Sequence, residues 1–423
     1  MSAVAEPKRA RAVMAGEPRR DPGPGRGGRV NKLPAWVPVA AVLLGTGWGA
    51  NQFPPLLLVY RPALELGADT LTALFGVYAA GLIPSLLVAG PLSDARGRRC
   101  VVVPAAVLSL LASAVLVMGA QSLELLFLGR ALAGVSSGVV FAAGTAWLRE
   151  VSAGQGQTAA QRAAIAMTAG FALGPLVSGL LAEWAPAPRV VPYIPHIAVM
   201  VVVLILQRGA PETVTGPTRP PRLAAPEVRE PRFLRVVAPM APWVFASPAI
   251  AFGLLPSVVG AAGATNRIAL GAGVTALTAV AGVLVQPLAR RLDAGGRIQP
   301  GTAGLIVAAG ALVLAAATAE AGVIWMLVPC AILFGSAYGL CLVAGIAEVG
   351  RLAHPGGLAG LTAVYYAIAY VGFAVPYLFA LGAGAVGYPT LLATAAVVAL
   401  ATAAIIARPR PTGAPRIAPA PAG

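Results

Sequence analysis

The sequence predicts an all-α membrane protein with 12 transmembrane helices, arranged as two pseudo-repeated bundles of six. Only 11% of the 423 residues are charged, whereas soluble proteins carry roughly 25%, so most of the surface must face lipid. The apolar residues gather in runs of about 20, which are long enough to cross a bilayer as helices. The runs are continuous rather than alternating, and this excludes a closed barrel, the other structure that spans membranes.

Twelve apolar segments follow one another, six on each side of a polar break at residues 208–234. We expect the first six spans near residues 35–59, 68–90, 101–119, 122–147, 160–184 and 191–207. We expect the second six near residues 236–260, 268–288, 300–319, 322–347, 357–383 and 387–407. The break contains PETVTGPTRPPRLAAPEVREPR, which has no helical periodicity, so it is predicted to link the two bundles.

The polar segments complete the predicted domain organisation. Residues 1–33 are basic, rich in Pro and Gly, and lack the apolar stretch of a signal peptide, so we expect a disordered cytoplasmic tail. The bundles are then predicted at residues 34–207 and 235–408, with a cytoplasmic linker at 208–234 and a second cytoplasmic tail at 409–423.

The net charge of +15 is distributed in a way that predicts a topology rather than a nucleic-acid partner. With the N-terminus inside, 26 of the 30 Lys and Arg residues fall on the cytoplasmic side, and only Arg61, Arg189 and Arg267 fall outside. Arg130 alone lies within a span. This is the positive-inside pattern, and losing one span would scramble it. We therefore predict a multi-pass protein of the plasma membrane with both termini in the cytoplasm.

The two halves of the chain also resemble each other. PLSDARGRR at residues 91–99 follows the second apolar segment, and PLARRLDAGGR at residues 287–297 follows the eighth. Aligning their Pro-Leu steps gives an offset of 196 residues and places Arg290 opposite Asp94, so a charge network in the second half would need a different pattern. A six-plus-six repeat predicts a binding site at the interface of the halves.

The sequence gives little evidence for a disulfide framework, a metal site, nucleotide binding or an enzyme activity. Cys100, Cys330 and Cys341 lack the paired spacing of a disulfide framework or a zinc site, and phosphate-loop and helical zinc motifs are absent. GVSSG at residues 134–138 matches the G-x-S-x-G pattern of serine hydrolases, but that pattern works at a strand-to-helix turn, and here it lies in an apolar run. An intramembrane serine hydrolase is therefore a remote alternative, and we expect no enzyme, no metal and no cofactor.

The loop after the second apolar segment carries a recognisable motif. Residues 90–99 read GPLSDARGRR and match G-x-L-x-D-x-x-G-R-[RK] at Gly90, Leu92, Asp94, Gly97, Arg98 and Arg99. This resembles the signature of the major facilitator superfamily, which implies a transporter that works by alternating access. The resemblance implies that Asp94 and the arginines form a cytoplasmic latch present in one state only. Gly97 would permit a tight turn, and Gly90 would permit close helix contact.

Two further segments extend the resemblance. Residues 126–138, LFLGRALAGVSSG, resemble the fourth-span motif of the family, with Arg130 as its charged residue. Residues 170–179, GFALGPLVSG, resemble the fifth-span motif of the 12-span drug/proton antiporter branch. The resemblance implies that Gly174 and Pro175 belong to the parts that change conformation.

Polar and aromatic residues at a similar predicted depth mark a candidate substrate site. Arg130 lies about seven residues from the outer end of its segment, and Asn51 and Gln52 lie about eight from theirs, so a rise of 1.5 Å per residue gives them similar depths. A charged residue inside a span is costly to bury, so Arg130 is a candidate functional residue. Aromatic residues that could contact an amphipathic substrate complete the set: Trp48, Tyr78, Trp243, Tyr366 and Tyr370. Packing and hydrogen bonding between helices without a ligand is the alternative.

Proton coupling has no obvious carrier, because no Asp or Glu lies in the middle of a predicted span. The candidates are Glu348 near an inner end, Asp69 near an outer end and His196 in the sixth segment. Arg130 also lacks an acidic partner, which an anionic substrate would supply. We expect a monomer that uses the proton gradient to export amphipathic small molecules, with uptake or exchange of a polar or anionic metabolite as the alternative.

Overall fold

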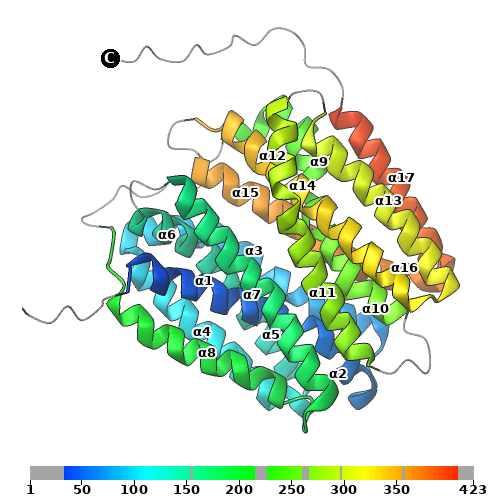
Figure 1. Ribbon diagram of the computed structural model, residues 1–423, viewed down its shortest axis with the longest axis horizontal. Coiled ribbons are helices and arrows are strands. Elements are labelled where there is room, and N and C mark those ends of the chain that lie inside the picture. Colours follow the sequence, from blue (N-terminus) through cyan, green and yellow to red (C-terminus); the bar gives the residue numbers. More distant parts are fainter. Residues whose placement is uncertain are drawn as a thin grey trace, which may run out of the picture. The chain divides into compact units, whose positions relative to one another are not determined.

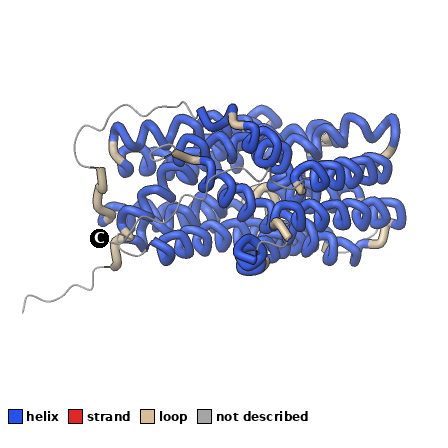
Figure 2. Tube along the Cα trace, turned by 90° about the horizontal axis from the view of Figure 1, so that it is seen from above, coloured by secondary structure: helices blue, strands red, loops and turns tan. Residues whose placement is uncertain are grey.

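The computed structural model describes residues 33–152, 156–214, 226–259, 266–295, 298–354 and 358–407. Their backbone forms helices joined by turns and loops, and no strand occurs in these ranges (Figure 2). The chain divides into two units, Met1–Pro34 and Ala35–Gly423, and the helices that the structure describes all lie in the second unit. The predictions for the C-terminal tail and for nearly all of the N-terminal tail lie outside the described residues.

The N-terminal half of the second unit contains eight described α-helices that make up six spans (Figure 1). They are α1 (Trp36–Asn51), α2 (Leu57–Ala63), α3 (Ala68–Arg96), α4 (Arg98–Met118), α5 (Leu123–Val139), α6 (Thr145–Val151), α7 (Gly156–Trp184) and α8 (Ile194–Leu206). A π-helical turn at Val140–Gly144 joins α5 to α6, so these two helices continue one span.

The C-terminal half contains nine described α-helices, several of which again combine into longer spans. They are α9 (Ala238–Pro248), α10 (Leu255–Val258), α11 (Arg267–Leu284), α12 (Gln286–Gly295), α13 (Pro300–Ala321), α14 (Leu327–Leu352), α15 (Leu358–Tyr370), α16 (Val375–Val386) and α17 (Tyr388–Ile406). A π-helical turn at Ala249–Leu254 joins α9 to α10, and a 3-10 turn at Val371–Ala374 joins α15 to α16.

Eleven helices among the described residues are long and apolar enough to cross a membrane. The remaining predicted span is the first, near residues 35–59, and its helix is interrupted. Pro54 and Pro55 have no N–H to donate to the carbonyls of Ala50 and Asn51, so α1 ends and a short 3-10 turn precedes α2. The predicted all-α fold of about twelve spans is confirmed, with one span broken in its middle.

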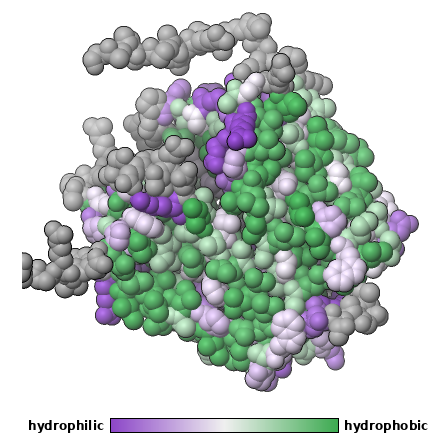
Figure 3. Space-filling model, viewed as in Figure 1, coloured by the Kyte–Doolittle hydropathy of each residue, from purple (hydrophilic) through white to green (hydrophobic). Residues whose placement is uncertain are grey.

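The outward-facing side chains suit a lipid environment. Large apolar residues such as Leu284 (74% exposed) and Leu381 (57% exposed) stand on the surface of their helices. Figure 3 shows hydrophobic residues over most of one face and strongly hydrophilic residues mainly near its margins. Apolar surface this extensive would be costly in water, so the chain is a multi-pass membrane protein.

The helices have two ends that need names. We call the end at which Gly97 lies, between α3 and α4, the motif end. The opposite end, where α7 finishes at Trp184 and α11 begins at Arg267, is the far end. The arginine distribution predicts that the motif end is cytoplasmic.

The two halves build the same helix crossing. In the N-terminal half, α3 and α5 approach so closely that a Cβ at Gly134 would clash with the carbonyl oxygen of Tyr78. In the C-terminal half, α11 and α14 make the same contact between Gly335 and the carbonyl oxygen of Thr278. Matching residues are 200 or 201 positions apart, so the structural repeat is longer than the 196 residues predicted from the sequence.

This longer offset corrects the alignment of the two loop motifs. An offset of 199 residues, one short of the smaller value at the crossing, places Asp293 opposite Asp94, and Asp-Ala-x-Gly-Arg then occurs in both halves, at residues 94–98 and 293–297. The shared Pro-Leu steps are a local coincidence that lies about one helical turn out of register. The prediction that Arg290 replaces the acidic residue was therefore wrong.

Candidate functional site

A small cavity of about 50 Å³ lies where helices of both halves meet. It is lined by Ala50, Asn51, Phe75, Tyr78, Arg130 and Phe171 of the first half and by Phe245, Pro248, Phe252, Thr275, Thr278, Ala279, Tyr338, Tyr370 and Phe373 of the second. Drug-sized ligands occupy pockets of roughly 300–1,000 Å³. In this conformation the cavity therefore has room for a few water molecules, and a substrate would require the halves to separate.

Arg130 is the cation of this central cavity, and the backbone supplies its hydrogen-bond acceptors. The side chain is 1% exposed, and its guanidinium donates to the carbonyls of Leu74 (3.2 Å), Phe75 (3.4 Å) and Ala50 (3.3 Å). The Ala50 carbonyl is one of those that lack a helical donor, because residue 54 is proline. Arg130 thus ties the break in α1 to α3 and α5.

Two aromatic rings complete the surroundings of Arg130. The guanidinium carbon lies 4.8 Å from the ring centroid of Phe53 and 4.7 Å from that of Tyr78, which is the range of a cation–π contact. No salt bridge joins Arg130 to a carboxylate anywhere in the described ranges. Within these ranges, the buried charge is therefore stabilised by backbone carbonyl dipoles and aromatic rings.

The structure separates the polar pair predicted on α1. Asn51 lines the central cavity. Gln52 is fully buried beside α4 and donates to the hydroxyl of Ser113 (2.7 Å). Trp48 packs its backbone against Gly174 of α7. Neither Gln52 nor Trp48 is among the residues that line the cavity, and their predicted contact with substrate would require another conformation.

The predicted aromatic residues divide in the same way. Tyr78 and Tyr370 line the central cavity, whereas Tyr366 and Trp243 are partly buried elsewhere and do not line it. The cavity therefore receives one predicted tyrosine from each half.

Phenylalanines supply most of the aromatic lining of the cavity. Phe245 stacks on Tyr370 with ring centroids 4.1 Å apart. Phe75 of α3 lies 5.1 Å from Phe373, so the rings join the two halves. Phenylalanine in a span gives no signal by itself, because a lipid-facing or packing role is equally compatible with its position.

Two of the predicted proton carriers have contrasting surroundings. Asp69 is exposed in the first turn of α3, at the far end. His196 is fully buried. Its Nε2 donates to the Gly45 carbonyl (3.0 Å), and its Nδ1 lies 2.8 Å from the hydroxyl of Ser113. A neutral imidazole uses both ring nitrogens in this arrangement.

Glu348, the third predicted carrier, lies in a charge network at the motif end of α14. Its carboxylate accepts two hydrogen bonds from Arg232 (2.9 and 3.1 Å) and one from Arg351 (2.9 Å). Arg351 also pairs with Asp293 of α12 (3.1 Å). A cavity of about 290 Å³ opens beside Asp293, Glu348 and Arg351. The network therefore combines a poorly exposed carboxylate with an open space.

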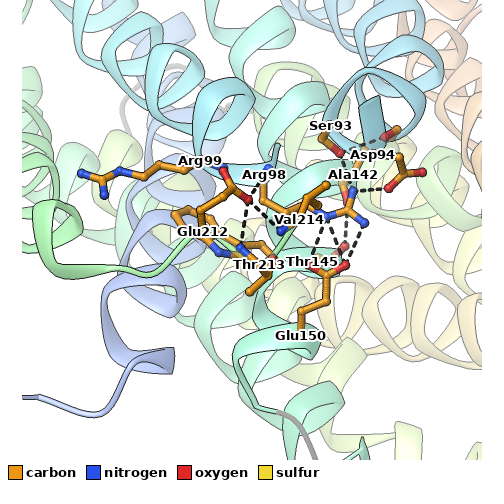
Figure 4. A network of polar contacts seen from close by, with 12 residues as sticks. Ser93, Asp94, Arg98, Arg99, Ala142, Thr145, Glu150, Glu212, Thr213 and Val214 are labelled. Carbon is orange, nitrogen blue, oxygen red and sulfur yellow. Dashed lines mark hydrogen bonds and ion pairs between the residues drawn. The ribbon is translucent and has the colours of Figure 1, made fainter. Parts of the chain in front are cut away.

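The loop motif forms the corresponding network in the first half (Figure 4). Arg98 pairs with Asp94, one helical turn before it, and with Glu150 at the end of α6 (2.8 Å). Glu150 also accepts a hydrogen bond from the hydroxyl of Thr213 in the linker. These contacts lie within the first half and the start of the linker, so the latch between the two states stays a prediction.

The start of the linker closes the N-terminus of α4. The Glu212 carboxylate accepts hydrogen bonds from the backbone N–H of Arg98 and Arg99, both at 2.9 Å. Gly97 has φ of +99°, as its predicted turn requires, and a Cβ there would lie 2.7 Å from that carboxylate. Burial raises the pKa of Glu212, but backbone hydrogen bonds from residues 98, 99, 213 and 214 outweigh it and lower the pKa overall.

The remaining motif glycines differ in their surroundings. A Cβ at Gly90 would meet nothing within 4 Å, so the prediction that Gly90 permits close helix contact is wrong for this conformation. A Cβ at Gly174 would lie 2.5 Å from the Trp48 carbonyl oxygen. Pro175 lies next to Gly174 within α7. The fifth-span motif thus packs directly against α1, and its part in conformational change stays a prediction.

The hydrolase-like pattern lies inside α5. The hydroxyl of Ser136 is buried there and donates to the Ala105 carbonyl (2.7 Å). No group of three or more metal-binding side chains occurs in the part of the chain that the structure describes.

Glu183, at the end of α7, is a candidate that nothing in the sequence marked. Its carboxylate accepts hydrogen bonds from the backbone N–H of Ile268 (2.8 Å) and Ala269 (3.0 Å), in the first turn of α11. This contact joins the two halves at the far end. A carboxylate near the end of an apolar run is typical of a residue at the membrane boundary. The sequence gives no sign of its contact with Ile268, because the two residues are 85 positions apart.

Comparisons with known proteins identify the family and the fold. The sequence profile of the Major Facilitator Superfamily matches residues 37–376. A POT family transporter, solved in complex with 5-aminolevulinic acid, is similar in structure with a TM-score of 0.71. The two chains are 12% identical, and the similarity covers 88% of this chain and 94% of that chain. At this identity the similarity shows the fold. No curated protein sequence matches.

Proposed function

Because this chain belongs to the Major Facilitator Superfamily, whose members are secondary active transporters, we propose that it exports amphipathic small molecules in exchange for protons. The central cavity carries this proposal. Its lining combines aromatic rings from both halves with a few polar groups, chiefly Asn51, Arg130, Thr275 and Thr278. Such a lining favours a molecule with an extended apolar part over a highly hydroxylated one.

Export would proceed by alternating access around this cavity. The cavity is only about 50 Å³ here, so substrate enters when one end of the interface between the halves opens. We propose that the motif end faces the cytoplasm of the plasma membrane and that the protein works as a monomer. The uneven distribution of arginine supports this orientation.

Glu348 is our first candidate for the proton carrier. Its side chain is 10% exposed, and it is held by two arginines beside a cavity of about 290 Å³. A carboxylate that loses or gains an arginine partner as helices move changes its affinity for protons. Asp69 and His196 are weaker candidates, because Asp69 is exposed at the far end and His196 already uses both ring nitrogens.

Accumulation of dyes and antibiotics tests this function directly. The chain is expressed in a host that lacks its own efflux pumps, and accumulation is measured with and without a protonophore. Export predicts lower accumulation that the protonophore reverses and that Glu348→Gln abolishes at unchanged expression. Lower accumulation that persists with the protonophore would contradict proton coupling, whereas no change for any compound would contradict export.

Transport of a polar or anionic metabolite is the second candidate function, and Arg130 favours it. Arg130 is a buried cation that lines the cavity and has no carboxylate partner among the described residues, so it could bind an anionic group of a substrate. The structurally similar POT family transporter was solved in complex with 5-aminolevulinic acid. Counterflow of labelled 5-aminolevulinic acid in proteoliposomes, with Arg130→Gln as the control variant, tests this alternative. Exchange that depends on Arg130 would replace the export proposal.

A further inference from the structure

The far end of the interface is held by α7 of the first half and α11 of the second. A Cβ at Gly179 would clash with the Cβ of Ala272, so the two helices are in close contact there. Glu183 follows Gly179 by one helical turn and therefore lies on the same face of α7. The carboxylate is thus placed where the halves must separate if the far end opens.

Glu183 supplies a cap that α11 lacks. The residue before α11, Asn266, has φ of +64° and makes no capping hydrogen bond with its side chain. The backbone N–H groups of Ile268 and Ala269 are the second and third of the helix, which a capping side chain normally satisfies. Both donate to the Glu183 carboxylate instead. A helix of one half is therefore capped by a carboxylate of the other.

In the part of the chain that the structure describes, the position of Glu183 is not set by an ion pair. Arg189, six residues further along the chain, donates instead to the Ala120 carbonyl (2.7 Å). A negative charge at a helix N-terminus is stabilised by the helix dipole as well as by the two hydrogen bonds. The contact also has no counterpart in the repeat, because α16, which corresponds to the outer part of α7, contains no Asp or Glu.

We propose that Glu183 is the latch of the far end, which holds that end closed by capping α11 across the two halves. Opening of the far end withdraws the carboxylate and leaves two backbone N–H groups of α11 without their partner. Removal of the carboxylate therefore favours the far-end-open state. This inference rests on the proposed function, since alternating access is what requires the far end to open.

Accessibility of a cysteine in the central cavity measures this equilibrium without any transport. Thr275 of α11 lines the cavity, so Thr275→Cys is placed in a background that carries Cys100→Ser, Cys330→Ala and Cys341→Ala. A membrane-impermeant thiol reagent is then applied to each side of sealed vesicles. Trp184→Cys, at an exposed position of the far end, identifies the far-end side.

We expect Glu183→Ala to raise the labelling rate from the far-end side about five-fold, the shift that the loss of one helix cap produces. Glu183→Gln keeps an acceptor but loses the charge, so a smaller increase is expected. Glu320→Ala is the matched control, because Glu320 is an exposed carboxylate near the same end of the protein, and its rate should equal that of the parent.

An unchanged rate in Glu183→Ala, with the protein still monodisperse, would overturn the latch, as would an equal increase in Glu320→Ala. If Glu183→Ala does not fold, Glu183→Gln decides the question in the same assay. Labelling needs neither substrate nor a proton gradient. A failure of the export proposal would therefore leave an increased labelling rate intact, and a failure of the latch would leave export intact.

Discussion

The two halves of the chain cross their helices in the same way but place different side chains beside the crossing. Gly134 and Gly335 occupy matching positions, and one helical turn before them stand Arg130 and Ala331. Arg130 reaches the carbonyl that the break in α1 leaves free, whereas Ala331 offers no polar group. The repeat thus fixes how the backbones meet, and the chemistry of the cavity is set separately in each half.

The largest expected effect comes from the shared crossing. Gly134→Ala or Gly335→Ala places a Cβ against a backbone carbonyl that no change of rotamer can move, and overpacking of this kind costs about 1–3 kcal/mol or more. We expect most of the folded protein to be lost in size-exclusion chromatography of detergent extracts. Gly310→Ala is the control, because a Cβ there meets nothing within 4 Å. Equal yields for all three variants would show that the crossing tolerates separation.

The second prediction concerns the difference between the halves. Arg130→Ala should abolish transport while the protein remains in the membrane, and it should lower stability by about 1–3 kcal/mol because a buried carbonyl loses its donor. Pro54→Ala restores a backbone N–H to the Ala50 carbonyl. If Arg130 acts through the break in α1, the double variant regains thermal stability and transport. If the double variant regained stability but not transport, the result would instead indicate that Arg130 binds the substrate.

The third prediction compares the charge networks of the motif end. Glu348 is 10% exposed and is bonded by two arginines, whereas Glu150 is 36% exposed and, among the described residues, is paired with one arginine, Arg98. Glu348→Ala should lower the free energy of unfolding by about 1–3 kcal/mol because two arginines lose their acceptor, and Glu150→Ala should lower it by less than about 1 kcal/mol. Thermal melting of the two variants in detergent measures this. The reverse order would show that the first network is the stronger one.

The smallest expected effect is the pH dependence of the linker contact. The pKa of Glu212 is lowered in the folded protein, so its contribution to stability is complete above its ordinary pKa of about 4.3 and is lost as the pH falls through the folded value. We expect proteolysis of the linker to increase at acidic pH in the wild type. Glu212→Gln should be cleaved at a rate that no longer changes over this range, because it carries no titrating carboxylate.

Apolar patterning was sufficient to predict the fold. The predicted spans and the observed helices agree within a few residues, except that helices such as α3 and α14 continue for several polar residues at the motif end. Hydropathy indicates which residues face lipid. Helical hydrogen bonding continues beyond those residues, so the helices are longer than the predicted spans. The break in α1 was visible as two consecutive prolines, but the donor that satisfies the Ala50 carbonyl is about 80 residues away and leaves no local trace.

The candidate site was predictable only in part. Depth along a helix predicted that Asn51 and Arg130 lie at the same level. In the structure both residues line the central cavity. Depth cannot give the direction of a side chain, and Gln52, the very next residue, is buried beside α4 instead. The contact of Glu183 with α11 involves backbone donors, which every residue carries, so no pattern of side chains could reveal it.

The linker is anchored at both of its ends by a glutamate. Glu212 caps α4 of the first half, and Glu227 accepts a hydrogen bond from the backbone of His354 in the second (3.2 Å). The chain between the two anchors, residues 213–226, can reach roughly 50 Å when extended. This contour length sets an upper limit on the distance that can separate the two anchors in the alternating-access motion that we propose. The linker would restrict this motion only if it were cut to a few residues. Shortening it stepwise would therefore measure how far the two halves move.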